Sequence, residues 1–220
     1  DKNTDGYKSL KARAEANEAF GAELKNGKKA DAQRGYEIAC KEWMDVRSFG
    51  QVFAFKGSEL SLGIRGPVSV QPAFSVDPID ITSMQITKSV NSEDKEGKSS
   101  DTMGMKHRVD FGVYILKGSI NVQLSEKTGF TEEDAEKIKE AIRTLFVNDS
   151  SSARPDGSMV MHKLYWWKHN CKIGQYSSHK VHNSIEIKKK EGVRNPRKIE
   201  DYEIICHELP GLAVEEYEGL

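Results

Sequence analysis

Hydrophobic and polar residues alternate most regularly between His107 and Leu124, and this alternation predicts a β-strand. Side chains of a strand point in turn to its two faces, so residues two apart share a face. The shared face carries Val109, Phe111, Val113 and Ile115, followed beyond Gly118 by Ile120, Val122 and Leu124. This stretch is the strongest strand prediction in the chain.

The spacing changes to that of a helix between Thr131 and Asp149. Thr131 is a favourable N-cap residue, and three acids follow it in the first turn, where the helix dipole stabilises negative charge. One face then carries Ala135, Ile138, Ala141, Ile142, Leu145 and Phe146. An amphipathic helix with a buried stripe is therefore expected here.

Weaker patterns predict the other elements. Residues 7–44 are rich in Ala, Glu and Lys and predict one or two helices, interrupted near residues 25–29 and ended by residues 45–50. Three prolines place residues 63–79 in an edge or bulged strand. Short late strands are predicted at residues 163–169 and 201–209.

From residue 63 onward the predicted order is strand, long loop, strand, helix, strand. A strand and a helix before it would complete β-α-β-β-α-β, so the predicted class is α+β with a ferredoxin-like arrangement. The long loop lies between Lys88 and Val109, is mostly polar, and ends in Lys-His-Arg. Loops beyond about a dozen residues are uncommon in compact domains and are usually functional or disordered. We therefore expect a flexible, functional projection.

Charge is distributed unevenly, although the formal net charge is only −1. Residues 162–198 contain ten Lys and Arg against two Glu, whereas residues 200–220 contain seven acids and neither Lys nor Arg. This asymmetry favours a basic working surface and an acidic tail that meets a basic neighbour. Two solvated faces are an equally good interpretation.

The composition argues against membrane and disulfide-rich classes of protein. Apolar runs such as VYIL are too short to span a bilayer, and no signal peptide is visible. Cys40, Cys171 and Cys206 form no C-x-x-C pair and fit free thiols in a reducing compartment. A cytoplasmic protein without a membrane partner is expected.

Signals for catalysis or metal binding are weak. His162, His169, His179 and His182 lie among basic residues without Cys or carboxylate ligands at zinc spacing, which disfavours a metal site. No G-x-S-x-G, P-loop or H-E-x-x-H motif occurs. Because nothing supplies a nucleophile, its base and an orienting group together, the chain is predicted not to be an enzyme and to need no cofactor.

Features of nucleic-acid binding are stronger. Cations lie in or beside predicted turns, where backbone N–H groups and a positive charge can converge on phosphates. Apolar side chains near them could stack on bases, although core packing is the commoner role for such residues. The polar set is Arg47, Arg65, Lys106, His107, Arg108 and Arg154, and the apolar set is Phe49, Phe74, Met84, Met103 and Met105.

Five segments between Trp43 and His207 carry a combined signal. They are DVRSFG, IRGPVSVQPAFSVDPI, TMGMKHRVDFGVYILKGSIN, TGFTEEDAEKIKEAIRTLFVNDSSSAR and IKKKEGVRNPRKIEDYEI. Together and in this order they resemble the filament-forming backbone subunit (Cas-seven type) of the type I-C CRISPR surveillance complex, Cascade.

The resemblance implies a ferredoxin-like palm, related to the RNA-recognition motif, with an inserted thumb hairpin and a helical finger region. Residues 1–50 are then a helical insertion leading into the palm, and residues 51–220 are the palm, with the thumb at about 80–106. Such a thumb accounts for the long polar loop, as a projection that becomes ordered on binding RNA and a neighbouring subunit.

Family members begin with a strand, an Asn-Gly-Asp-Pro-rich loop and a basic helix. None is found before Asp1, so we expect this strand and helix, and some residues after Met44, to be missing.

The resemblance also implies function and partners. Such subunits polymerise along one CRISPR RNA in a helical filament and present its spacer for pairing with a target DNA strand in antiviral defence. Other Cascade partners are the RNA-processing subunit and the large subunit. Carried over by position, the expected RNA contacts are Arg47, Ser48, Phe49, Arg65, Gln71, Ser75, Met103, Lys106, His107 and Arg154. Cations are expected on phosphates, Gln71 and Ser75 on sugars or phosphates, and Met103 on a displaced base, independently of spacer sequence.

Two alternatives are open. A metal-independent RNA-processing endonuclease on a similar fold could use His107 or His169 with a Tyr or Lys as general acid and base. Alanine at the active histidine would then abolish cleavage and spare binding. An unrelated protein-interaction module could use the basic stretch and the acidic tail for self-assembly. Its assembly would need no nucleic acid and would be indifferent to nuclease.

Overall fold

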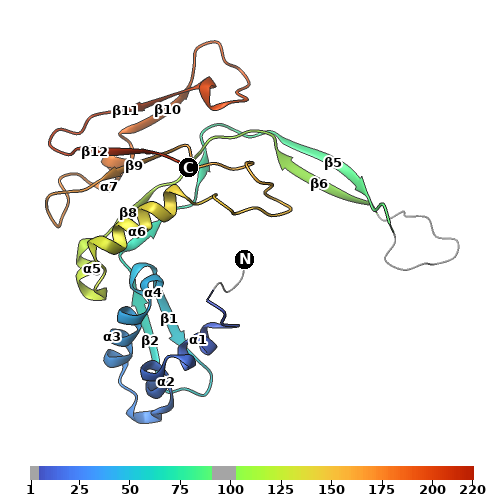
Figure 1. Cartoon of the computed structure of the whole chain (residues 1–220). Helices are drawn as coiled ribbons and strands as arrows, with labels where there is room; N and C mark the ends of the chain where they lie inside the picture. The colour runs from blue at the N-terminus through green and yellow to red at the C-terminus, as the bar shows by residue number, and fades with distance from the viewer. Residues whose placement is uncertain (1–4, 91–102) are drawn as a thin grey trace, which may run out of the picture. The chain divides into compact units, whose positions relative to one another are not determined.

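The computed structural model describes residues 5–90 and 103–220, which form two compact units (Figure 1). The first unit comprises Asp1–Val70, Gly118–Ser178 and Leu209–Leu220, and the second comprises Gln71–Lys117 and His179–Glu208. The architecture is mixed α+β with small antiparallel sheets, which confirms the predicted class and is consistent with the expected palm. The tip of the predicted thumb, residues 91–102, lies outside the described residues.

Helices open the first unit. Their bounds are α1 (Leu10–Ala16), α2 (Glu18–Lys25), η1 (Gly27–Lys29, a 3₁₀ turn), α3 (Ala32–Glu42) and α4 (Met44–Phe49). The predicted interruption near residues 25–29 is confirmed, because α2 ends there and η1 follows. The prediction that residues 45–50 end the helix is wrong. Trp43 already ends α3 in an extended conformation, and most of that segment forms α4, which Gly50 terminates.

The strands β1 (Gly50–Ala54) and β2 (Ser61–Arg65) form an antiparallel hairpin against these helices. Its inner face buries Phe53, Leu62 and Ile64. The ring of Phe53 lies 4.8 Å from that of Phe20 and 5.7 Å from that of Trp43, centroid to centroid. This aromatic cluster is the centre of the larger hydrophobic core.

A smaller core lies among β3 (Val68–Val70), β8 (Gly118–Ile120) and α6 (Glu132–Arg143). The helix α5 (Val122–Thr128) joins β8 to the segment before α6. Thr131 caps α6 in a capping box with Asp134, which confirms the predicted helix start. The single strand predicted at residues 107–124 is wrong, because only residues 107–109, 114–115 and 118–120 are in strands. Beyond residue 120 the side chain of Asn121 accepts a hydrogen bond from the Leu124 N–H and begins α5. The strands β9 (Lys163–Trp167) and β12 (Val214–Glu218) pair antiparallel in the same unit, and β9 confirms the first late strand.

The second unit consists mainly of short antiparallel pairs. They are β4 (Phe74–Ser75) with β7 (Tyr114–Ile115), β5 (Ile81–Thr87) with β6 (Met103–Val109), and β10 (Ile185–Lys189) with β11 (Tyr202–Cys206). The helix α7 (Ser178–His182) and the 3₁₀ turn η2 (Ile199–Asp201) precede β10 and β11. The strand predicted at 63–79 is divided among β2, β3 and β4, because its prolines interrupt the pairing.

Candidate nucleic-acid interface

Two glycines allow the end of α4 to lie against the end of β2. Gly50 has φ +84° and is the register partner of Arg65. A Cβ on Gly50 would lie 2.3 Å from the carbonyl oxygen of Ile64, and a Cβ on Gly66 would lie 2.2 Å from that of Ser48. Neither distance leaves room for a side chain, so the two backbone segments can cross only with glycine at both positions.

The crossing fixes an aromatic residue and a cation at neighbouring backbone positions. Phe49 directly precedes Gly50, and Arg65 directly precedes Gly66. Phe49 is 52% exposed, and Arg65 is also exposed. An exposed ring and an exposed guanidinium on adjoining backbone segments suit stacking on a base and contact with a phosphate. The structure thus brings two of the predicted contact residues together.

Arg47, from the same segment, is held inside the fold. Its Nε and Nη2 atoms donate to the two carboxylate oxygens of Asp134 at 2.8 and 2.7 Å. Its Nη1 atom donates to the carbonyl oxygens of Cys40 and Lys41 near the end of α3, at 3.5 and 3.4 Å. The hydrogen bonds from Arg47 keep the pKa of Asp134 below its ordinary value of 3.8. Arg47 therefore ties α3 and α4 to the N-terminus of α6.

Ser48, the next predicted contact residue, has no exposed surface. Its Oγ has no hydrogen-bond partner within residues 5–90 and 103–220. A buried hydroxyl without a partner carries a desolvation cost. In this conformation Ser48 cannot touch a ligand, and it contributes its backbone to the glycine crossing.

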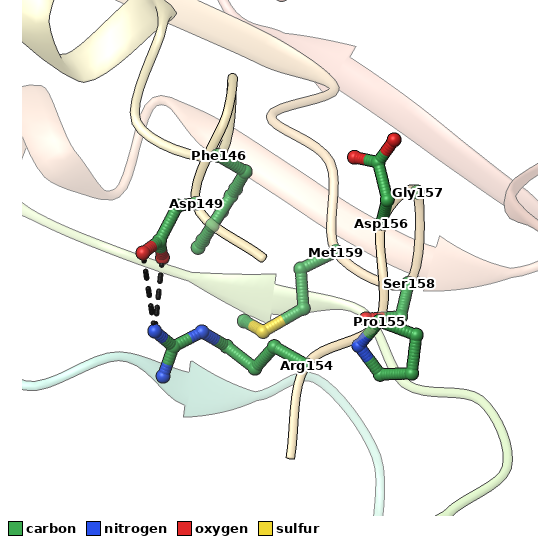
Figure 2. A pocket seen from close by; sticks show the side chains of 8 residues that line it. All are labelled: Phe146, Asp149, Arg154, Pro155, Asp156, Gly157, Ser158 and Met159. Carbon is green, nitrogen blue, oxygen red and sulfur yellow. Dashed lines mark hydrogen bonds and ion pairs between the residues drawn. The ribbon is translucent and has the colours of Figure 1, made fainter. Parts of the chain in front are cut away.

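Arg154 lies in a separate turn of the first unit. Figure 2 shows its side chain turned toward Asp149, and the closest ion-pair distance is 3.1 Å. The backbone of Arg154 exchanges hydrogen bonds with that of Ser151, which closes the turn. The hollow beside it, lined by Phe146 and Met159 among others, has room for about one water molecule. Arg154 is therefore an exposed cation at a turn, as predicted, but it already has a carboxylate partner.

Three predicted contact residues lie in the β5–β6 hairpin of the second unit. Met103 and His107 share one face, and the Nδ1 atom of His107 lies 2.8 Å from the Oγ atom of Ser83, its register partner. Lys106 lies on the opposite face with Arg108. All these residues of β6 are exposed, so one face of the hairpin offers cations and the other offers methionine and histidine.

The remaining two predicted residues, Gln71 and Ser75, lie beside the β4–β7 pair. The backbone N–H of Gln71 donates to the carbonyl oxygen of Lys117 at 2.8 Å, and its side chain is exposed. Ser75 pairs with Tyr114 and is half-buried. Five of the ten predicted residues thus belong to each unit.

Sequence reasoning missed the outward face of the β1–β2 hairpin. Val52 and Gly63 are register partners on this face, and both are exposed. The alternation in QVFAF and SLGIR was the available signal, because every second residue of these two short runs is buried or partly buried. It was obscured because the runs are only five residues long.

Several residues considered for other roles are engaged within the first unit. The Nδ1 atom of His169 accepts a hydrogen bond from the Gln175 N–H at 2.9 Å. The acidic C-terminal strand meets lysines of its own chain, with Lys139 Nζ 3.0 Å from Glu215 and Lys163 paired with Glu216. These acids therefore have partners without a basic neighbouring molecule.

The described residues were also searched for membrane-spanning helices and for groups of metal ligands. Among residues 5–90 and 103–220, no helix is long and apolar enough to cross a bilayer. Within the same ranges, no three His, Cys, Asp or Glu side chains are grouped as ligands for a metal ion.

The sequence of the chain matches the model of one protein family. The family model of CRISPR-associated protein Cas7 matches residues 2–207. A solved chain titled "CRISPR RNA-guided surveillance complex, pre-nicking" is similar over 56% of this chain and 33% of its own length, with 22% identity and a TM-score of 0.40. This chain thus spans about a third of that one. No curated protein matches it.

Proposed function

Since the chain belongs to the family of CRISPR-associated protein Cas7, we propose that it is a non-catalytic subunit that binds CRISPR RNA. The geometric observation that carries the proposal is the crossing at Gly50 and Gly66, which brings the exposed residues Phe49 and Arg65 to adjoining backbone positions. The family match includes this crossing. Arg65 attracts phosphate by its charge, and this attraction does not depend on the RNA sequence. The stacking of an aromatic ring on a base is also independent of the sequence.

The proposed contacts follow the RNA backbone. Arg65 and Lys106 bind phosphates, Phe49 stacks on a base, and Met103 contacts a displaced base beside His107. Each of these side chains is exposed. Because the contacts do not read base edges, pairing of the guide supplies the sequence specificity.

The proposal also includes four more polar or charged residues, and two of them are already in ion pairs. Gln71 and Ser75 bind sugars or phosphates from the β4 region. Arg47 and Arg154 reach a phosphate only by exchanging Asp134 and Asp149 for it. Exchange is easier for Arg154, because that pair is exposed, and surface ion pairs are worth at most about 1 kcal/mol.

The proposal extends to assembly. Copies of the chain line up along one guide RNA in a helical filament and hold its spacer for pairing with target DNA, together with an RNA-processing subunit and a large subunit. The type I-C assignment, the cytoplasmic location, the helical insertion at 1–50, the palm at 51–220 and the thumb at about 80–106 belong to the same proposal. The β5–β6 hairpin supports the thumb, because it flanks the long polar loop.

Size-exclusion chromatography with ultraviolet absorbance tests this function, using the chain with and without a CRISPR-length RNA. We expect assemblies whose size grows with RNA length and that collapse after ribonuclease. The variant Arg65→Ala/Lys106→Ala should shift this equilibrium toward free protein. The matched control Lys11→Ala/Lys137→Ala also removes two exposed positive charges, both from helix surfaces, and should assemble normally. A monomer indifferent to RNA would contradict the proposal for the isolated chain.

A further inference from the structure

The turn between α2 and α3 contains the one Asn-Gly pair of the sequence, Asn26–Gly27. Asn26 is exposed and follows the last residue of α2, and Gly27 begins the 3₁₀ turn η1. The side-chain amide of an asparagine can be attacked by the backbone nitrogen of the next residue, and glycine hinders this attack least because it has no Cβ. The pair therefore has the residue types of a spontaneous deamidation site.

The nitrogen of Gly27 is available for this attack. Within residues 5–90 and 103–220 its N–H has no backbone hydrogen-bond acceptor, whereas the neighbouring Asn26 N–H donates to the Glu23 carbonyl oxygen at 3.2 Å. Gly27 has φ +53°, and a Cβ built on it would meet no described heavy atom within 4 Å. The described surroundings therefore neither pair with this nitrogen through the backbone nor crowd its Cα.

Two hydrogen bonds hold Asn26 out of the reacting arrangement. Its ψ of −5° turns the Gly27 nitrogen away from the side chain, so ring closure needs a rotation about this bond. The Lys29 N–H, which donates to the Asn26 carbonyl oxygen at 3.1 Å, and Asn26 Nδ2, which donates to Glu23 Oε2 at 3.2 Å, must both let go. The first belongs to a short 3₁₀ turn, where hydrogen-bond geometry is poor. Local opening of this turn is therefore sufficient for the reaction.

We propose that Asn26 is a deamidation site whose reaction destabilises the junction between α2 and α3. The Gly27 nitrogen gives its proton to solvent and bonds to Cγ of Asn26, the Cγ–Nδ2 bond breaks, and the amide group takes a proton from solvent and leaves as ammonia. Water then adds to either carbonyl carbon of the resulting succinimide and leaves aspartate or isoaspartate. The overall change consumes one water, releases one ammonia and involves no oxidation or reduction. It does not depend on the proposed RNA binding.

The product acts on Glu23, a buried carboxylate that Asn26 helps to satisfy. Glu23 is 3% exposed, and its Oε2 accepts hydrogen bonds from Asn26 Nδ2 and the Asp31 N–H, each at 3.2 Å. Its Oε1 pairs with the exposed Arg34 at 3.3 Å. A carboxylate at position 26 replaces a donor to Glu23 by a like charge. Isoaspartate also adds a methylene to the backbone of the turn, so either product weakens the connection of the two helices.

Mass spectrometry of chymotryptic peptides follows the reaction at each asparagine while the purified chain is kept in mildly alkaline buffer. Asn183 is the internal comparison, because it is also exposed but the Ser184 N–H after it donates to the Val181 carbonyl oxygen at 3.1 Å. The test variant is Gly27→Ala. Its matched control is Gly57→Ala, which also replaces a glycine of positive φ with open space around it in the same unit.

We expect Asn26 to react at least about tenfold faster than Asn183, and Gly27→Ala to slow it at least about tenfold while Gly57→Ala leaves it unchanged. Thermal unfolding measures the consequence. Asn26→Asp, which imitates one product, should melt about 2–4 °C below the unaltered chain, whereas Asn26→Gln, which keeps an amide donor, should not. If Gly27→Ala melts below Gly57→Ala, the two rates are measured again in urea, where the same tenfold difference is expected because the folded turn is absent from both.

Equal rates at Asn26 and Asn183 would overturn the proposal, and so would a rate in Gly27→Ala, in buffer and in urea, that matches its control. If Asn26→Asp melts with the unaltered chain and the aged protein does too, the predicted effect on the junction is wrong. Whether the chain binds RNA has no influence on these outcomes, so failure of this proposal and failure of the proposed function are separate results.

Discussion

Two antiparallel hairpins of this molecule, β1–β2 and β5–β6, have the same secondary structure and opposite environments. In β1–β2, the inner face buries Phe53, Leu62 and Ile64 against helices. In β5–β6, thirteen of the fourteen residues are exposed, so neither face has a core. An isolated two-stranded hairpin is at best marginally stable in water. The first hairpin is therefore held by a core and is called the platform below, whereas the second has no core of its own among the described residues.

The base of the second hairpin is anchored by polar contacts. Asp77, just before β5, accepts a hydrogen bond from Tyr202 Oη at 2.8 Å and pairs with Lys189 at 3.2 Å. Asp110, just after β6, accepts hydrogen bonds from Thr82 and Arg108. Polar anchors of this kind orient an arm without covering its apolar side chains. The comparison shows two ways to hold a hairpin in place: a hydrophobic core under one face, or polar contacts at its base.

The largest expected effect is that of Phe53→Ala, which removes the centre of the platform's core. The free energy of unfolding should fall by about 3–5 kcal/mol because a buried aromatic ring is replaced by a cavity. Met84→Ala on β5, an exposed position, should change it by less than about 0.5 kcal/mol. Urea denaturation followed by tryptophan fluorescence measures both. Similar losses for the two variants would remove the contrast between the hairpins.

A smaller effect is expected from Asp134→Asn, which leaves Arg47 without its carboxylate. The loss should be about 1.5–3 kcal/mol, as for a charge-assisted hydrogen-bonded pair. Glu133→Gln in the same helical turn is the control, since its pair with Lys137 is exposed. If the control loses as much, Arg47 has no special role in joining α3, α4 and α6.

The same pair predicts a pH dependence. The pKa of Asp134 is below its ordinary 3.8 in the folded chain, so the folded state holds the carboxylate charged while the unfolded state takes up a proton. The stabilisation is fully present above pH 3.8 and is lost as the pH falls below it through the folded-state pKa. Urea midpoints should therefore fall more steeply in this acid range for the unaltered chain than for Asp134→Asn.

Arg65→Ala on β2 and Lys106→Ala on β6 compare the two hairpins by their RNA affinity rather than by their stability. Each should reduce the slope of log K against log salt by about 0.7, the value for one phosphate contact on a single strand. Their urea midpoints should stay unchanged, because both side chains are exposed. Anisotropy titrations at several salt concentrations measure the slope, with Lys137→Ala as control. A slope unaffected by either change would show that neither hairpin carries a phosphate.

The smallest effect is expected from Tyr202→Phe at the anchor of the β5–β6 hairpin. Loss of the hydrogen bond to Asp77 should cost about 1 kcal/mol, whereas Tyr114→Phe, an exposed tyrosine of the same unit, should cost almost nothing. Burial and the bond to Asp77 raise the pKa of Tyr202 to about 12. This stabilisation is present below pH 10 and is lost as the pH rises toward 12. Identical alkaline unfolding curves for the variant and the unaltered chain would contradict the anchor.

Much of the fold follows from local signals in the sequence. The Thr131 cap and the helical spacing after it were enough to predict where α6 begins, because capping and amphipathicity act within a few residues. The predicted end at Asp149 is wrong, since α6 ends at Arg143 and Leu145 beyond it is exposed. Local pattern failed at Val122 and Leu124, where alternation resembled a strand but the Asn121 cap began a helix. Periodicity over so short a run cannot separate the two, and the N-cap decides.

The candidate site was harder to predict because it depends on contacts between distant segments. The motif around Arg47 predicts a contact segment, but only the structure shows that Asp134, far away in sequence, is paired with its guanidinium. Gly50 and Gly66 likewise become meaningful only when their backbones cross. The sequence thus predicts residue types near RNA, and tertiary pairing decides which of them are open to it.

The most direct test of the central claim is amide hydrogen exchange of the two hairpins, with and without single-stranded RNA. In the free chain we predict slow exchange in β1–β2 and fast exchange in β5–β6, because only the first has a core. RNA should slow exchange strongly in β5–β6 and leave the paired amides of β1–β2 almost unchanged. Exchange in β5–β6 that is equally fast with saturating RNA would contradict an arm completed by RNA and the RNA-binding function built on it.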